Sequence, residues 1–182
     1  MQDEKFWDTK EGGYFSSELE KNLVLRKKEY EDHAKPNGNA LTCLNLLKLT
    51  ALTGDQKYYS NASQILSGSE HWMKRYPMSF SHLLIACDYY LGSAKEVAII
   101  GNDQEPFIQD VIHHLHFNYY PNKILAFSEE KNVNQLQMTS KKEKIQDKAT
   151  VTICERGTCG LPIQTLEEVT AQMKLVNRYT LD

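Results

Sequence analysis

A polar turn segment that leads directly into a helix without a polar face is the feature that most constrains this fold. Residues 36–39 read Pro-Asn-Gly-Asn, and these residue types favour turns over helix interiors. Residues 40–52 are mainly apolar, which predicts a helix that is buried on nearly all sides. We expect Asn39 to cap its first turn and Gly54 to end it as a left-handed residue. The loop thus brings charged side chains to the mouth of a buried helix, where functional residues often lie.

Two further helices are expected after this one. The first covers residues 55–75, with a weak point at Gly68 where it could break. The second begins after Pro77, covers residues 78–91 and is again apolar on nearly all sides. Such helices cannot bury themselves. We therefore expect them to pack against helices of another chain or of a segment that precedes residue 1.

The start of the chain carries aromatic residues around a glycine turn. Gly12-Gly13 marks the turn, and we expect Tyr14-Phe15 to pair with residues 23–25 as a short hairpin. A new domain seldom opens in this way. The expectation is that the chain begins inside a larger protein.

From residue 95 the hydrophobic pattern changes to strands that alternate with helices. A polar stretch over 128–147 has no clear periodicity, which predicts a surface loop or a partly ordered insertion. The order of elements predicts a small α/β unit with a partly parallel sheet. Its expected strands cover 96–100, 123–127 and 149–154, and its helices begin at Pro106 and cover 166–175.

The composition argues against several classes of function. A net charge of −3 with 41% hydrophobic and 25% charged residues is ordinary for a globular protein and gives no reason to expect nucleic acid or a membrane as partner. No apolar run approaches the ~20 residues that span a bilayer. No signal peptide is visible at the N-terminus, so we expect a cytoplasmic location. We expect no cofactor and no metal.

A series of short motifs runs through nearly the whole chain. The first group is Trp7-Asp, Gly12-Gly-Tyr-Phe15, Leu25-Arg-x-Lys28, Asp32-x-Ala-x-Pro-x-Gly-Asn39, Asn45-Leu-Leu-x-Leu49 and Thr53-Gly54. The second group is Glu96-Val-Ala-Ile-Ile-Gly101, Tyr120-Pro-Asn-Lys123 and Ala149-Thr-x-x-x-Cys-Glu-x-x-x-Cys159-x-x-Pro162. In this order they resemble the YyaL-type thioredoxin-domain-containing family, whose animal member is spermatogenesis-associated protein twenty.

The resemblance implies an α+β chain that forms the C-terminal part of a longer protein. Full members have a thioredoxin-like domain, then an (α/α)6 toroid of the six-hairpin glycosidase type, similar to N-acylglucosamine 2-epimerases, and a small α/β segment. Residues 1–92 would be the last toroid hairpins, and residues 93–182 the small α/β subdomain. The missing N-terminal toroid and thioredoxin-like domain are then the implied partners. Two positions depart from the family motif, which usually has Gly at His33 and Ser at Asn37.

The charged loop suggests carbohydrate chemistry. Under this hypothesis, the activity belongs to the full-length parent protein. A carboxylate and an imidazole in reach of each other can move a proton at a sugar carbon, which makes Asp32 and His33 the acid/base candidates of a sugar isomerase or epimerase. The candidate substrate-binding residues are Arg26, Lys28, Asn39 and Trp7.

The alternative is a non-catalytic interaction or redox-linked module. In that interpretation Arg26 and Asp32 pair to hold the loop, Asn39 only caps a helix, and the aromatic side chains of Trp7, Tyr14 and Phe15 pack in the interior. A toroid cleft also needs residues from helices that lie outside this chain.

The cysteines leave the redox question open. Cys154 and Cys159 have four residues between them, which is not the spacing of a dithiol redox motif or of most zinc ligand pairs. A disulfide and a reduced pair both remain, with the reduced pair as the default in a cytosolic chain. His113 and His116 share a helix face that we expect to be solvated, so a zinc site is not predicted.

Overall fold

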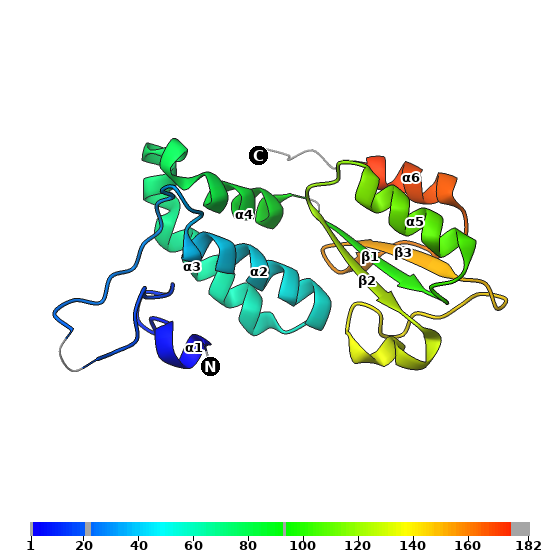
Figure 1. Cartoon of the computed structure of the whole chain (residues 1–182), viewed down its shortest axis with the longest axis horizontal. Helices are drawn as coiled ribbons and strands as arrows, with labels where there is room; N and C mark the ends of the chain where they lie inside the picture. The colour runs from blue at the N-terminus through cyan, green and yellow to red at the C-terminus, as the bar shows by residue number, and fades with distance from the viewer. Residues whose placement is uncertain (1, 21–22, 93, 176–182) are drawn as a thin grey trace. The chain divides into compact units, whose positions relative to one another are not determined.

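The computed structural model describes residues 2–20, 23–92 and 94–175, and they form two units (Figure 1). The first unit holds residues up to 50 together with residues 55–90. The second unit holds residues 51–54 and the chain from residue 91 onwards. Helices and a small mixed sheet together make the chain an α+β protein, as the sequence predicted.

Helices dominate the first unit. They are α1 (Gln2–Phe6), α2 (Gly38–Thr53), α3 (Gln56–Arg75), the 3-10 turn η1 (Pro77–Phe80) and α4 (Ser81–Leu91). Gly54 follows α2 with a φ of 75°, which confirms the predicted left-handed end. Asp55 caps α3 by accepting a hydrogen bond from the Lys57 backbone. The break considered at Gly68 is absent, because α3 runs unbroken to Arg75.

The core of the first unit lies between α2, α3 and α4. The thiol of Cys43 on α2 lies 3.6 Å from the Ala62 carbonyl oxygen on α3, a distance that requires close packing of the two helices. The rings of Tyr59 and Tyr90 stack with centroids 5.4 Å apart and join α3 to α4. The buried side chains of these helices include Leu46, Leu47, Ile65, Leu66, Leu83 and Ala86.

The hairpin expected near the N-terminus is wrong. Tyr14 forms an isolated bridge with Trp7, and the two rings pack edge to face with centroids 4.9 Å apart. The side chains of Leu23, Val24 and Leu25 are exposed, and these residues form no strand. The backbone N–H of Tyr14 donates instead to the side-chain oxygen of Asn39, which fixes Tyr14 against the start of α2.

The capping residue of α2 also differs from the expectation. The side-chain oxygen of Asn37 accepts from the backbone N–H of Asn39 at 2.8 Å and of Ala40 at 3.3 Å, which is the geometry of an N-cap. Asn39 lies inside the first turn, because α2 begins at Gly38. Asparagine is among the residue types most favoured at an N-cap, which fits Asn37 in this position.

A four-stranded sheet organises the second unit. Strands β1 (Lys95–Ile100) and β2 (Lys123–Ser128) are parallel, and β3 (Thr150–Glu155) and β4 (Thr158–Cys159) are added antiparallel in the order β2-β1-β3-β4. Helix α5 (Pro106–Phe117) connects β1 to β2 and begins at a proline. The structure confirms the predicted α/β unit with its partly parallel sheet, its three long strands and its two helices.

Each face of the sheet has its own cover. On one face α5 and α6 (Leu166–Lys174) pack on the sheet (Figure 1). On the other face Ala98 and Ala126 contact Met138, which lies in the polar stretch after the 3-10 helix η2 (Glu130–Gln135). That stretch therefore contributes a core residue, although its sequence predicted only a surface loop or insertion. The first face buries Val97, Ile99, Ile108, Val111, Leu115, Val151, Ile153, Val169 and Met173.

Candidate functional site

Arg26 and Lys28 both lie against the N-terminal segment. The Arg26 guanidinium donates to the carbonyl oxygens of Ser17 at 3.0 Å and Lys5 at 2.9 Å, and it lies 4.0 Å from the centre of the Phe15 ring. These contacts order the loop by hydrogen bonding and by cation–π attraction. The guanidinium is thus bound to backbone oxygens. The predicted pairing of Arg26 with Asp32 is therefore wrong.

Lys28 forms a small charge network. Its ammonium donates to Asp8 at 2.7 Å, to Glu11 at 3.0 Å and to the Gly12 carbonyl oxygen at 3.2 Å. Burial disfavours the charged ammonium, but the hydrogen bonds to Asp8 and Glu11 prevail and raise the pKa of Lys28 above its ordinary value. The hydrogen bond from Lys28 in turn lowers the pKa of the Asp8 carboxyl. Lys28 stays charged at neutral pH.

These side chains line a cleft of about 490 Å³ in the first unit. Its wall combines cationic, anionic and phenolic groups with one leucine, a lining that can donate hydrogen bonds to a polar ligand and accept them from it. The cleft brings together Arg26 and Lys28, two of the predicted substrate-binding residues. The other lining residues are Glu11, Leu25, Lys27, Tyr30 and Gly68.

Asp32 connects the polar loop to the start of α4. One carboxylate oxygen accepts from the Asn37 backbone N–H at 2.9 Å, and the other accepts from the His82 backbone N–H at 2.8 Å. Burial opposes ionisation, but these hydrogen bonds and the nearby His82 ring lower the pKa of Asp32. Asp32 therefore stays ionised at neutral pH with both oxygens engaged.

The imidazole nearest to Asp32 is that of His82. Its Nδ1 atom lies 3.3 Å from a carboxylate oxygen of Asp32. His33 is exposed, and its backbone N–H donates to the Lys35 carbonyl oxygen. Sequence reasoning missed His82 because it lies 50 positions from Asp32, and no local pattern indicates that pairing.

Asn39 is a buried connector between three segments. Its side-chain oxygen accepts from the Tyr14 N–H at 2.7 Å, and its side-chain nitrogen donates to the carbonyl oxygens of Tyr14 and Glu29, each at 2.9 Å. Trp7 is half-buried against Tyr14. Among the substrate-binding candidates, Asn39 is thus committed to holding the chain.

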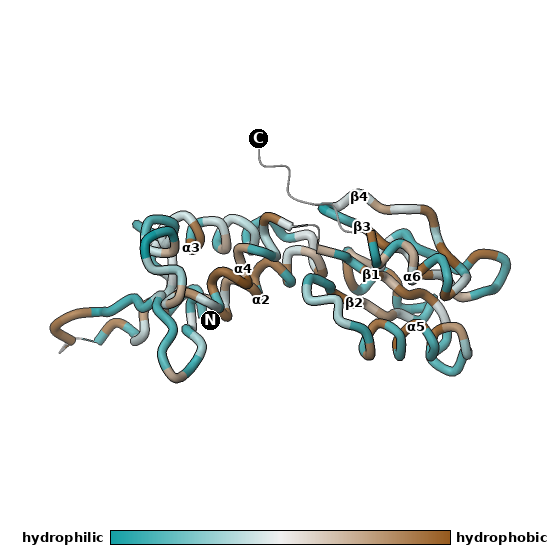
Figure 2. Tube along the Cα trace, turned by 90° about the horizontal axis from the view of Figure 1, so that it is seen from above, coloured by the Kyte–Doolittle hydropathy of each residue, from teal (hydrophilic) through white to brown (hydrophobic). Residues whose placement is uncertain are grey.

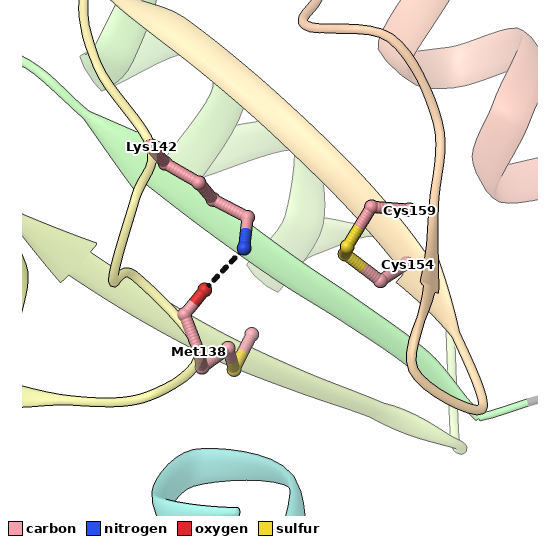
Figure 3. Close-up of a disulfide and its surroundings, with 4 residues drawn as sticks. All are labelled: Met138, Lys142, Cys154 and Cys159. Atoms are coloured by element: carbon pink, nitrogen blue, oxygen red, sulfur yellow. Dashed lines mark hydrogen bonds between the residues drawn. A yellow bond between two sulfur atoms is a disulfide. The ribbon is translucent and has the colours of Figure 1, made fainter.

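Cys154 and Cys159 form a disulfide between β3 and β4 (Figure 3). The two residues are direct partners across the hairpin, whose turn is Arg156-Gly157 with positive φ at both positions. Such a two-residue turn brings the flanking residues into register without a longer loop. The structure therefore decides in favour of the disulfide, and the reduced pair that was the default expectation is wrong. Cys154 is 3% exposed, whereas Cys159 is exposed.

Two titratable side chains share the sheet face of Cys154. Glu96 is the antiparallel partner of Cys154 in the register of β1 and β3, so the two side chains are neighbours on one face. Burial raises the pKa of Glu96. Burial also lowers the pKa of Lys142, whose ammonium donates to the Met138 carbonyl oxygen at 2.7 Å on this face of the sheet (Figure 3).

A second cleft, of about 530 Å³, lies where the parallel strands β1 and β2 end. Gly101, Asn102, Glu129, Glu130, Lys131 and Lys144 line it. Beside it the Glu105 carboxylate accepts from the backbone N–H groups of Asn102 at 2.8 Å and Ala149 at 3.3 Å, and it pairs with Lys144 at 3.2 Å. Burial alone would raise the pKa of Glu105, but these hydrogen bonds and the Lys144 charge outweigh it and lower the pKa.

The substitution Glu105→Gln tests this connection as a function of pH. A carboxyl whose pKa is lowered by folding stabilises the protein above its unfolded pKa, and this stabilisation disappears as the pH falls through the folded pKa. We expect the variant to lose about 1–2 kcal/mol at pH 7, in line with charge-assisted hydrogen bonds, and to lose less at pH 3, where more of the parent carboxyl is protonated. Urea unfolding at both pH values measures this. An equal loss of stability at the two pH values would contradict the prediction.

The remaining candidates give no metal or membrane site in the described part of the chain. His113 and His116 are exposed, as predicted. His114 lies with its Nε2 atom 3.1 Å from the Tyr120 hydroxyl, which the sequence did not indicate. Among residues 2–20, 23–92 and 94–175, no group of three metal-binding side chains could hold an ion. No helix within these ranges is long and apolar enough to cross a membrane.

Comparison with known proteins gives one consistent similarity. The chain is 32% identical over 169 residues to spermatogenesis-associated protein 20 of Rattus norvegicus, and 31% identical over 168 residues to the protein of that name in Homo sapiens. The alignments cover 90% and 89% of this chain but 21% of each relative. The chain therefore spans about a fifth of the length of the curated relatives it matches. No family model and no solved structure matches it.

Proposed function

We propose that this chain is the C-terminal part of a longer protein. Its similarity to spermatogenesis-associated protein 20 over nine-tenths of its length supports membership of that family. In this proposal the first unit supplies the last hairpins of a helical toroid. Its function there is to complete that toroid as a non-catalytic module. The observation that carries the proposal is the exposure of aliphatic side chains on α2 and α4, two helices with almost no polar face that Figure 2 colours as largely hydrophobic.

Each of these two helices carries exposed aliphatic side chains. Leu41 and Leu49 lie eight positions apart on α2, which is the spacing of a single helix face, and they are 45% and 37% exposed. Leu84 and Ile85 on α4 are 38% and 50% exposed. Burying apolar surface yields about 25 cal/mol per Å². Helices of a toroid packed beside α2 and α4 would gain this free energy.

The substitution Ile85→Lys tests the role of this face. Because Ile85 is half exposed, we expect the free energy of unfolding to change by less than about 0.5 kcal/mol, as is usual at surface positions. We expect self-association of the isolated chain to fall, because a charge then interrupts the apolar surface. Light scattering across a concentration series measures the association, and Ser67→Lys on the exposed side of α3 is the matched control.

The same variant tests docking onto the rest of a longer protein. The rat relative without the region aligned to this chain serves as the complement in trans. Parent chain and control should form a soluble complex with it, and Ile85→Lys should bind at least tenfold more weakly. A monomeric parent chain that does not bind the complement would contradict the proposal.

A second candidate function is carbohydrate binding, which the polar cleft beside Arg26 and Lys28 favours. The N–H groups of Arg26 that do not bind Ser17 or Lys5 can donate to sugar hydroxyls, and the Glu11 carboxylate can accept from the hydroxyls. Isomerase or epimerase activity is proposed only for the longer parent. Asp32 and His33 are its acid/base candidates, and His82 is the imidazole within reach of Asp32.

The carbohydrate proposal predicts stabilisation by ligand. A ligand that binds the native state alone raises the unfolding free energy, by about 2.7 kcal/mol at a hundredfold excess over Kd. We expect a free or N-acylated monosaccharide to raise the Tm of the chain and Arg26→Gln to abolish that rise. Lys123→Gln in the second unit is the control and should keep it. If no monosaccharide changes the Tm, the cleft does not bind sugar in this chain.

A further inference from the structure

We propose that the Cys154–Cys159 disulfide is a thiol–disulfide exchange site, which an external dithiol reduces by attacking Sγ of Cys159 while Sγ of Cys154 leaves. The site comprises the hairpin β3–β4 and the sheet face beneath it (Figure 3). The proposal is independent of the toroid and of carbohydrate binding.

Unequal burial sets the direction of attack. Exchange requires a thiolate to approach one sulfur along the S–S axis, and the accessible sulfur is the one attacked. Cys159 is exposed on β4, which is a two-residue edge strand. Cys154 is 3% exposed within β3 and pairs with β1 on its other side. An incoming thiolate therefore reaches Cys159 first.

The sheet face carries titratable groups near the sulfur that leaves. Glu96 neighbours Cys154 on this face, and the ammonium of Lys142 belongs to the same cluster because its charge acts on Glu96. Because Glu96 is the register partner of Cys154, its carboxyl lies where a proton can pass to the departing thiolate, and burial raises the pKa of this carboxyl.

The exchange balances as two displacements. In the first, a thiolate of the dithiol forms a bond with Sγ of Cys159, the Sγ–Sγ bond breaks, and Cys154 keeps the electron pair and takes a proton. In the second, the other thiolate of the dithiol attacks the dithiol sulfur that is bonded to Cys159. The mixed disulfide breaks, and Cys159 leaves and takes a proton. The dithiol is oxidised to a cyclic disulfide, and the protein gains two electrons and two protons as two thiols.

The hairpin can persist after reduction. Glu155 and Thr158 remain strand partners, and the Gly160 N–H donates to the Ile153 carbonyl oxygen at 3.0 Å beyond the disulfide. The turn at Arg156-Gly157 also stays two residues long. Reduction is therefore expected to free two thiols while strand pairing is retained.

The experiment uses the oxidised full chain and two thiol probes. Dithiothreitol is titrated under native conditions, and the thiols are alkylated and mapped by mass spectrometry, with far-UV circular dichroism followed in parallel. We expect both thiols to appear without loss of the dichroism signal. Resistance to 10 mM dithiothreitol until the chain is unfolded by urea would overturn the proposal, as would loss of the folded signal on reduction.

A brief reaction with glutathione, quenched in acid, tests the direction of attack. We expect the mixed disulfide at Cys159 and a free thiol at Cys154, and the opposite distribution would overturn the proposed order. Single variants supply a second measurement. The Cys159 thiol of Cys154→Ser should react with a maleimide at least tenfold faster than the Cys154 thiol of Cys159→Ser, and equal rates would contradict the proposal.

Discussion

Replacing Asp32 with alanine is expected to destabilise the first unit by about 3 kcal/mol. The carboxylate accepts two backbone hydrogen bonds, from Asn37 and His82, and its removal leaves both N–H groups without this partner. Hydrogen bonds to charged groups contribute about 1.5–3 kcal/mol each, and water can replace part of that loss. The loop would keep the backbone hydrogen bond from the Asp32 N–H to the Ser79 carbonyl oxygen, but it would lose its side-chain bond to the start of α4.

The two tryptophans make this loss measurable. Trp7 and Trp72 both belong to the first unit, so urea unfolding followed by tryptophan fluorescence reports on that unit. His82→Ala is the matched control, because it removes the imidazole and keeps the backbone N–H that donates to Asp32. We expect this control to change the unfolding free energy by less than about 1 kcal/mol.

The same pair of variants separates structure from catalysis in a longer parent. Asp32→Ala alone is ambiguous, because lost folding and lost proton transfer both lower activity. His82→Ala removes the neighbouring imidazole with little loss of stability. Activity that is lost in His82→Ala would support a reacting Asp32–His82 pair, whereas unchanged activity would leave Asp32 as a connector. A small effect of Asp32→Ala on stability would contradict the connector role itself.

Replacing Ile99 with alanine is expected to destabilise the second unit by about 3–4 kcal/mol. Ile99 lies on the central strand β1, is fully buried, and packs within the cluster that α5 and α6 form with the sheet. Truncation removes its transfer free energy and leaves a cavity, since neighbouring side chains relax only partly. Chemical denaturation followed by far-UV circular dichroism measures the change.

Phe127→Ala is the matched control for this core. Phe127 is the partner of Ile99 in the parallel register of β1 and β2, but it is 36% exposed at the edge of the sheet. Because part of its ring already contacts water, we expect a clearly smaller loss of stability. Equal losses for the two variants would show that the α5–α6 face is not the centre of this core.

Local sequence patterns determined most of the secondary structure. The apolar run after the polar turn gave α2, Pro106 gave the start of α5, and Val169 and Met173 gave the buried face of α6. Each of these features depends on backbone geometry and on the periodicity of neighbouring residues, so a single sequence carries it. The change of pattern at residue 95 likewise predicted the partly parallel sheet.

Which groups meet depends on how distant segments pack. Asp32 contacts His82 across 50 positions, and Tyr14 pairs with Trp7 and Asn39 where the sequence favoured a hairpin with residues 23–25. Two asparagines near the start of α2 could each cap it, and the burial of Asn39 against the N-terminal segment left that role to Asn37. Long-range contacts depend on how elements pack, which no local pattern encodes.

The two cysteines show the same division. Their number and spacing followed from the sequence, but the spacing allowed either a disulfide or a reduced pair. The positive-φ turn at Arg156-Gly157 and the register of β3 with β4 place them opposite each other. The fold then buries one and exposes the other. Local patterns thus account for most of the helices, the three long strands and the available chemistry, whereas the partners of each group follow from the fold, because burial and pairing arise only when distant segments pack together.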